Sequence, residues 1–212
     1  RSKSSEKERF DVAKIFRRET WCIGESAFAV LLLLIGTSML DGFYGSYYNL
    51  NQLVFDAFDA PVSIIGIFFG ASYAVNATAY IAADFFSSRF GKRNTMLGSM
   101  LIEAGLFMIL PWFASNPLCL FGLSMVLCFL PEVVYITSEN LIQDAIADDL
   151  RATILSVASL VRALFSAMFF SIFGYVLGLY PIQIALGVIG AIAIAITAVV
   201  SLKMVGIHVS KN

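Results

Sequence analysis

The chain has 212 residues, of which 59% are hydrophobic and 14% charged, and its mean hydropathy is +0.83. Soluble domains carry about a quarter charged residues, so this composition excludes a protein whose main solvent is water. The net charge of −1 without a basic face argues against a nucleic-acid partner, and the isolated cysteines and the single His208 predict no metal site, disulfide framework or cofactor.

The first 20 residues form a charged segment that precedes any apolar run. Four apolar residues recur in it at near-helical spacing, namely Phe10, Val12, Ile15 and Phe16. We expect a cytoplasmic leader that is either an amphipathic helix at the membrane interface or a solvated linker. The chain starts with Arg and its first apolar run is too long and too late for a signal peptide, so we expect a piece of a longer protein or a processed one.

Six apolar runs follow, each close to the roughly 20 residues that a membrane-spanning helix needs. They cover approximately residues 22–49, 61–86, 95–113, 117–142, 152–179 and 181–204, and they leave 205–212 as a tail. Pro61, Pro117 and Pro181 each open a run, where a helix tolerates the missing amide hydrogen. The sequence therefore predicts an all-α membrane protein with six transmembrane helices in residues 21–204.

Lys and Arg lie almost entirely on one side of these runs. They precede the first run, follow the second and the fourth, or close the chain, whereas the loops after the first, third and fifth runs contain none. Cytoplasmic loops carry the excess of Lys and Arg, so both termini are expected in the cytoplasm. Arg162 is the one basic residue that lies far from both ends of its run.

The turn between the second and third runs contains a basic motif. Arg89, Gly91, Lys92 and Arg93 resemble the cytoplasmic loop motif of the major facilitator superfamily of transporters, although Ser88 stands where the family has Asp and Asp84 where it has Gly. We expect Arg89 and Arg93 to hold neighbouring helix ends by pairing with carboxylates. Asp84 and Asp144 are the nearest candidates.

A second segment, residues 148–156 with Arg151, resembles the start of the eleventh helix in bacterial members of that superfamily. The resemblance implies the second half of such a transporter, built as two three-helix inverted repeats, in a plasma membrane such as the bacterial inner membrane. It also implies a partner, either the missing N-terminal six-helix half or a second copy, and a small-molecule solute. The third and sixth helices are expected at the periphery.

Four ionisable residues stand inside the predicted spans, where each one needs a partner or a water-filled cavity: Asp41, Glu103, Glu132 and Arg162. At a rise of about 1.5 Å per residue, Arg162 and Glu132 both lie about 16 Å from the cytoplasmic boundary, and Glu103 about 15 Å. An Arg162–Glu132 pair is therefore predicted, either for transport or only for helix packing. Glu139 lies nearer to a helix end and is interpreted as interfacial.

Polar residues also recur at helical spacing on two spans. One stripe on the second run comprises Ser72, Asn76, Tyr80 and Asp84, with Tyr73 beside it, and a shorter one on the fifth comprises Ser159, Arg162 and Ser166. On the first run, Gly42 and Gly45 interrupt Asp41, Tyr44 and Tyr48, which predicts a kink or a break. Pro131 is expected to bend the fourth run beside Glu132.

The resemblance, together with these intramembrane polar residues, implies a secondary transporter of a small organic solute, with proton-coupled efflux as one form of it. Tyr73, Tyr80 and Tyr135 would suit a partly apolar solute. The alternative is a non-transporting assembly or regulatory subunit, in which the polar stripes serve packing alone. An enzyme is not expected, because no membrane-embedded His, metal-ligand cluster or Ser with a base at suitable spacing is present.

Overall fold

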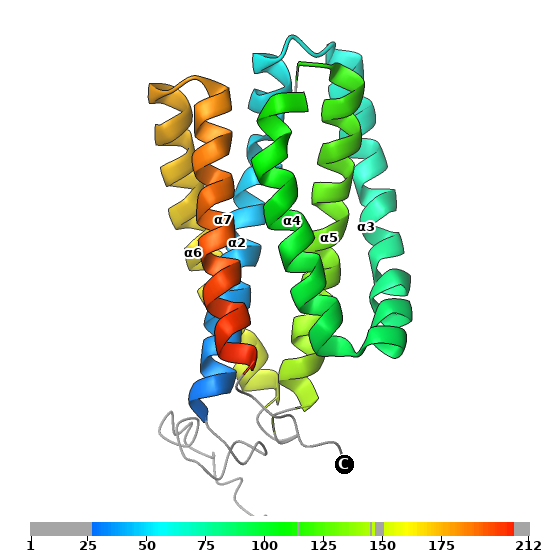
Figure 1. Ribbon diagram of the computed structural model, residues 1–212, viewed down its shortest axis with the longest axis vertical. Coiled ribbons are helices and arrows are strands. Elements are labelled where there is room, and N and C mark those ends of the chain that lie inside the picture. The colour runs from blue at the N-terminus through cyan, green and yellow to red at the C-terminus, as the bar shows by residue number, and fades with distance from the viewer. Residues whose placement is uncertain (1–26, 114, 145, 147–150, 206–212) are drawn as a thin grey trace, which may run out of the picture.

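The computed structural model describes residues 27–113, 115–144, 146 and 151–205. These residues form six helices and no strand. The helices are α2 (Ala27–Ala57), α3 (Val62–Phe90), α4 (Lys92–Phe113), α5 (Pro117–Asp144), α6 (Arg151–Leu179) and α7 (Ile182–Val205). They run side by side as one elongated bundle (Figure 1). The predicted leader, residues 147–150 and the tail after 205 lie outside the described residues.

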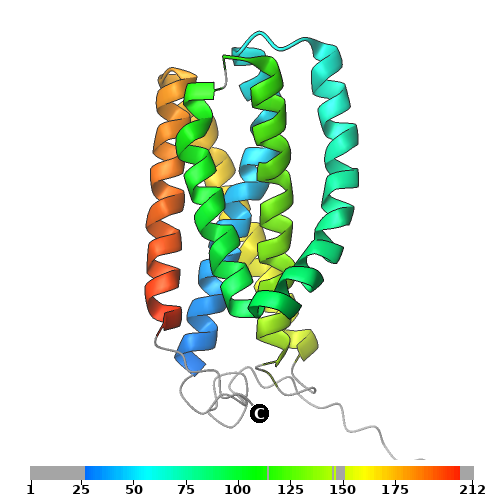
Figure 2. The ribbon, with the colours of Figure 1, turned by 45° about the vertical axis from the view of Figure 1, so that its right-hand side comes forward.

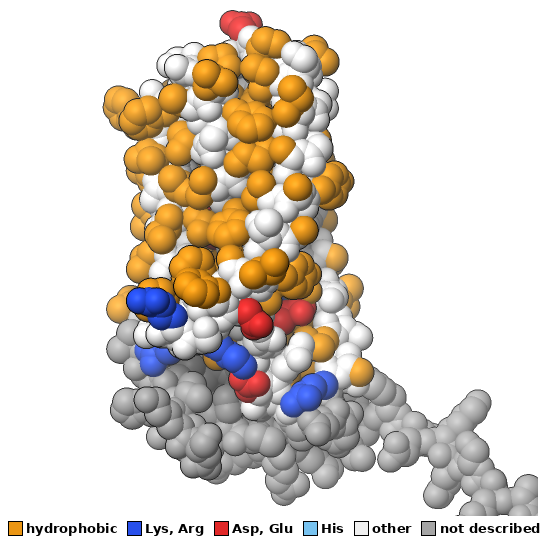
Figure 3. All heavy atoms as spheres, turned by 90° about the vertical axis from the view of Figure 1, so that its right-hand side faces the viewer, with side chains coloured by type: hydrophobic (Ala, Val, Ile, Leu, Met, Phe, Trp, Pro, Cys, Tyr) orange, Lys and Arg blue, Asp and Glu red, His pale blue; other side chains and the backbone are white. Residues whose placement is uncertain are grey.

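Five of these helices, α3 to α7, are long and apolar enough to cross a membrane. The helix α2 has 31 residues and extends along most of the same bundle (Figure 2). On the face shown in Figure 3, basic and acidic side chains gather at one end, and beyond them the surface is apolar or uncharged apart from an acidic side chain at the opposite tip. The chain is therefore an integral membrane protein.

The helix bounds differ most from the predicted runs at the end of the first one. The predicted run ends near residue 49, but α2 continues to Ala57. Asn51 is fully buried on the inner face of this part of the helix, whereas Gln52 and Asp56 are exposed on its outer face. The α3–α4 turn is very tight: Gly91 has a φ of 81°, donates its N–H to the Ser87 carbonyl at 3.0 Å, and is followed at once by α4. Glycine suits this turn because it has no Cβ.

An aromatic cluster joins α2, α4 and α6. The ring of Phe43 packs edge-to-face against Tyr44, Phe107, Phe169 and Phe173, with centroids 5.0 to 5.6 Å apart. Phe43 and Phe107 are fully buried. Such pairs are worth about 0.5 to 1.5 kcal/mol each beyond the burial of their surface. The cluster therefore fixes the spacing of three helices near the middle of the bundle.

The helices α2 and α6 approach closely at Gly42. A Cβ atom at this position would lie 2.7 Å from both the Phe165 Cβ and the Ser166 backbone nitrogen. One turn on, the Ser46 hydroxyl donates to the Ser166 carbonyl at 2.9 Å and to that of Gly42 at 2.7 Å. The predicted break at the glycines is wrong: α2 is continuous. Gly42 instead lets the two helix backbones meet.

Candidate functional site

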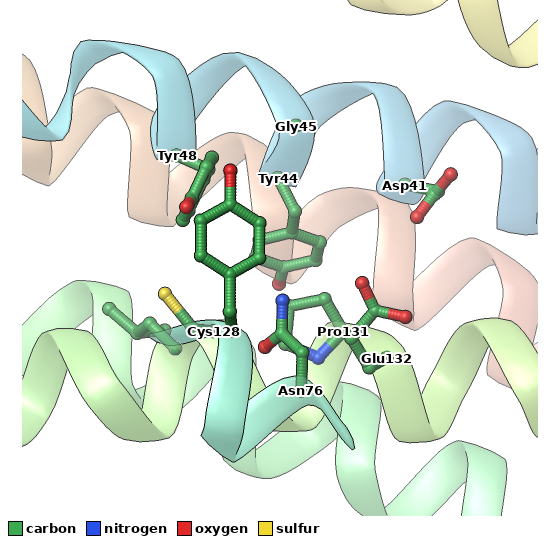
Figure 4. Close-up of a pocket in the computed structure, with 10 residues that line it drawn as sticks. Asp41, Tyr44, Gly45, Tyr48, Asn76, Cys128, Pro131 and Glu132 are labelled. Atoms are coloured by element: carbon green, nitrogen blue, oxygen red, sulfur yellow. The ribbon is translucent and has the colours of Figure 1, made fainter. Parts of the chain in front are cut away.

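A pocket of about 190 Å³ lies between α2, α3 and α5. Ten residues line it (Figure 4): Asp41, Tyr44, Gly45 and Tyr48 from α2, Tyr73 and Asn76 from α3, and Leu127, Cys128, Pro131 and Glu132 from α5. The members from each helix are three or four positions apart and therefore share one helix face. Carboxyl, phenol and amide groups thus converge on one place from three apolar helices.

Hydrogen bonds between helices hold the pocket wall. The Tyr48 hydroxyl lies 3.1 Å from the Ser72 hydroxyl, which joins α2 to α3. With its amide nitrogen turned to these carbonyls, Asn76 donates to Ser72 at 3.2 Å and to Cys128 at 3.1 Å, which joins α3 to α5. Hydrogen bonds in apolar surroundings hold their partners in one geometry. The predicted stripe on α3 therefore serves the pocket through Ser72 and Asn76.

Arg162 belongs to a charge cluster beside the pocket. Its Nε lies 2.6 Å from Asp41 Oδ2, an ion pair whose N–H direction does not make a regular hydrogen bond, and its terminal nitrogen lies 3.7 Å from Glu139 Oε1. The guanidinium carbon sits 4.1 Å from the centre of the Tyr135 ring. The predicted Arg162–Glu132 pair is thus wrong, and Glu139, interpreted from the sequence as interfacial, contributes a contact to this cluster.

Two carboxyl groups line the pocket itself. Asp41 and Glu132 come from α2 and α5, and in Figure 4 the Glu132 carboxyl points towards Asp41. Asp41 is neutralised by Arg162, whereas Glu132 makes no ion pair with any residue that the structure describes. Pro131, directly before Glu132, leaves α5 continuous.

Glu103 is buried behind the pocket and not in it. The helix α4 presents this side chain to the bundle interior, where it is 0% exposed beside the Tyr44 hydroxyl. The Glu103 carboxyl and the Tyr44 hydroxyl are close enough to interact, but the contact does not have regular hydrogen-bond geometry. Glu103 lies at a depth similar to that of Arg162 in the sequence-based estimate, but Asp41 and Glu139 are the carboxylates that hold that guanidinium.

The predicted site residues on α3 lie at different positions along the helix, and only some of them reach the pocket. Tyr73 lines the pocket and is 71% exposed, so the pocket is open on that side. Tyr80 and Asp84 lie further along the helix, exposed and outside the pocket. Among the described residues, no group of three His, Cys, Asp or Glu side chains could hold a metal ion.

The basic loop motif lies at the end of the bundle where α3 ends, α4 begins and α5 ends. Lys92 Nζ lies 2.5 Å from Asp144 Oδ2 and joins the start of α4 to the end of α5. This contact comes from Lys92 and not from the predicted Arg89, which is exposed in the last turn of α3. Arg151, which opens α6, donates through Nε to the Gln143 carbonyl at 3.2 Å. The motif thus contributes helix-end contacts.

Comparisons of the chain with protein-family models, with curated proteins and with solved structures give no match. The pocket and the charge cluster therefore carry the functional argument by themselves.

Proposed function

We propose that this chain is the second six-helix half of a secondary transporter that resembles the major facilitator superfamily, and that it moves a small organic solute. The observation that carries the proposal is the pocket, where side chains from α2, α3 and α5 bring two carboxyls together near the middle of the bundle. Ionisable groups at that depth cost several kcal/mol and are rarely kept without a function. Solute sites of secondary transporters lie near the bilayer midplane.

The exposed faces of α3 and α6 support a partner unit. Each carries exposed small residues about one turn apart: Gly66, Gly70 and Ala74 on α3, and Ala163, Ala167 and Ser171 on α6. Small residues let helix backbones approach closely within a membrane. A second six-helix unit packed on these faces would enclose the pocket, whether it is a separate N-terminal half or a second copy.

Cross-linking tests this partner surface. Single cysteines at Ala163 and at Ile194 are compared in a chain freed of its own cysteines, both sites being exposed, on α6 and α7 respectively. We expect membrane preparations to give cross-linked dimers, or cross-links to a separate unit, at Ala163 only. Equal cross-linking at Ile194 would contradict the proposed interface.

The proposal includes an orientation in which the basic end of the bundle and both termini face the cytoplasm of the cell, in a plasma membrane. The two groups of three helices, α2–α4 and α5–α7, would be the inverted repeats. Single cysteines at Asn116 and Asp59 should react with an impermeant thiol reagent from outside intact cells, and one at Lys92 should not. The reverse labelling would overturn the orientation.

Flux across vesicles tests transport itself. The protein is reconstituted with a pH-sensitive dye inside, together with its partner unit if cross-linking detects one, and candidate solutes are added outside. Solute-dependent proton movement that is lost in Glu132→Gln supports proton-coupled transport, with Asp41, Glu132 and Glu103 as the available proton carriers. Solute flux without proton movement would leave transport in place and exclude the coupling.

The alternative is a non-transporting assembly or regulatory subunit, which the exposed small-residue faces of α3 and α6 would serve equally well. It predicts cross-linking at Ala163 with no flux of any solute. It also predicts that Glu132→Gln, which changes no contact between helices in the described chain, has no effect on the function of the assembly.

A further inference from the structure

The charges around the pocket do not balance. The cluster contains one guanidinium, that of Arg162, and carboxyl groups from Asp41 and Glu139, while Glu132 adds another carboxyl in the pocket wall. Arg162 lies within ion-pair distance of the first two and does not line the pocket. Glu132 faces the pocket and makes no ion pair in the described chain, because Arg162 acts on it only from beyond ion-pair distance. A site of this kind attracts a positive charge.

The other walls suit a cation that carries apolar groups. Tyr44, Tyr48 and Tyr73 surround the same space, with Leu127 and Pro131 beside them. Cations bind over the faces of aromatic rings, and more strongly where water is excluded. The protein already uses this interaction nearby, because Arg162 lies over the ring of Tyr135. A metal ion fits less well, since the described residues offer no three-ligand cluster.

The volume of the pocket also limits the size of the ligand that it can hold. Its volume of about 190 Å³ lies below the roughly 300 to 1,000 Å³ usual for small-molecule sites. The exposed Tyr73 marks the side on which another unit would complete the enclosure. This half therefore holds either a small ligand or one end of a larger one.

We propose that the pocket takes an organic cation, an amine or quaternary ammonium with an aromatic or aliphatic body, and that Glu132 pairs with its charge. The inference rests on the proposed transport function and names the substrate class of the same pocket. Tyr73 supplies the aromatic face on the open side, and Asp41 remains bound to Arg162.

Equilibrium dialysis of the purified chain in detergent tests the pairing, with the signal of protein-free micelles subtracted. The probes are radiolabelled benzyltrimethylammonium, a cation, and phenylacetate, an anion of similar size. We expect the cation alone to bind, Glu132→Gln to weaken its affinity about tenfold, and Glu132→Asp to retain part of it. Tyr73→Ala, at an exposed position, should weaken it as well.

The control is Asp56→Asn, which removes an exposed carboxyl at the far end of α2, outside the pocket, and should leave the affinity unchanged. Equal binding of both probes, no binding of the cation to the wild-type chain, or an unchanged affinity in Glu132→Gln while the variant elutes as the wild type would each overturn the proposal. Cation binding without vesicle flux would overturn transport and keep the cation site. Vesicle flux of an anionic or neutral solute without cation binding would overturn the cation site and keep transport.

Discussion

The pair α3 and α6 differs from the pair α4 and α7 in packing and not in hydropathy. The most apolar stretches of α3 and α6 are only 17% and 11% buried, against 39% and 44% for α4 and α7. Mean hydropathy does not separate the pairs, with values of 1.5 and 1.8 against 1.6 and 2.5. The helices α3 and α6 lie on opposite flanks in Figure 1, and each packs mainly on one neighbour, α5 and α2 respectively. Hydropathy finds the spans but does not find their neighbours.

The two pairs of helices also differ in whether their ionisable side chains have charged partners. On α6, Arg162 is partly exposed and held by two carboxylates, whereas on α4, Glu103 is fully enclosed and makes no ion pair with any described residue. Removing a paired charge leaves its partners uncompensated, but removing an unpaired one relieves a cost. The same kind of substitution should therefore change stability in opposite directions in the two regions.

The largest effect is expected for Arg162→Leu. This change leaves Asp41 and Glu139 without their cation inside the bundle, which costs about 3 to 5 kcal/mol for a buried pair. We expect a large fall in the unfolding temperature in detergent, measured by size-exclusion chromatography after heating. The double variant Arg162→Leu, Asp41→Leu should recover part of the loss. If Glu132→Leu rescues Arg162→Leu as well as Asp41→Leu does, the ion pair of the structure is not the operative one.

Gly42→Ala is expected to have the next largest effect, because the α2–α6 contact would have to open. The added Cβ meets backbone atoms of α6, and overpacking of this kind costs about 1 to 3 kcal/mol. The matched control is Gly45→Ala, whose Cβ would lie 3.6 Å from the Ser166 hydroxyl, an ordinary contact. Equal unfolding temperatures for the two variants would show that α2 and α6 do not meet at Gly42.

The helices could be predicted from the sequence because each apolar run is long and is bounded by charge, Pro or Gly. The end of α2 could not, since Asn51 reads as a loop residue until the bundle that buries it is known. The arrangement of the spans as repeats and their orientation stay predictions.

Of the predicted site residues, Asp41, Tyr73, Asn76 and Glu132 line the pocket, but the pairing of the charges was not predicted. Depth alone placed Arg162 beside Glu132, yet depth does not say which helix faces which, and the close approach at Gly42 brings Asp41 to Arg162 instead. The sequence contains one signal that Glu139 lies near the other charged residues, because Glu132, Tyr135 and Glu139 fall at helical spacing on one face of α5. Its short distance from the helix end instead favoured an interfacial interpretation.

Glu103→Met should act in the opposite direction to Arg162→Leu. Methionine fills a similar volume and removes two buried oxygens without regular hydrogen bonds, so the free energy of unfolding should rise by about 1 kcal/mol. The measurement is the same thermal assay, with Glu103→Gln as the variant that keeps a polar group. A fall in stability as large as that of Arg162→Leu would mean that Glu103 has a partner in the protein as it is purified.

The smallest effect is expected for Lys92→Ala. The Lys92–Asp144 pair resembles the Arg162–Asp41 pair in its short distance, but its side chains are 39% and 61% exposed, against 22% and 28%. Exposed pairs contribute about 0 to 1 kcal/mol, and salt screens them because the Debye length falls from about 8 Å at 0.15 M to about 3 Å at 1 M. The difference in unfolding temperature between Lys92→Ala and the wild type should therefore vanish in 1 M salt. The difference between Arg162→Leu and the wild type should persist. If both differences vanish together, the Arg162 cluster is as open to solvent as the helix end, and the contrast between the two charge sites fails.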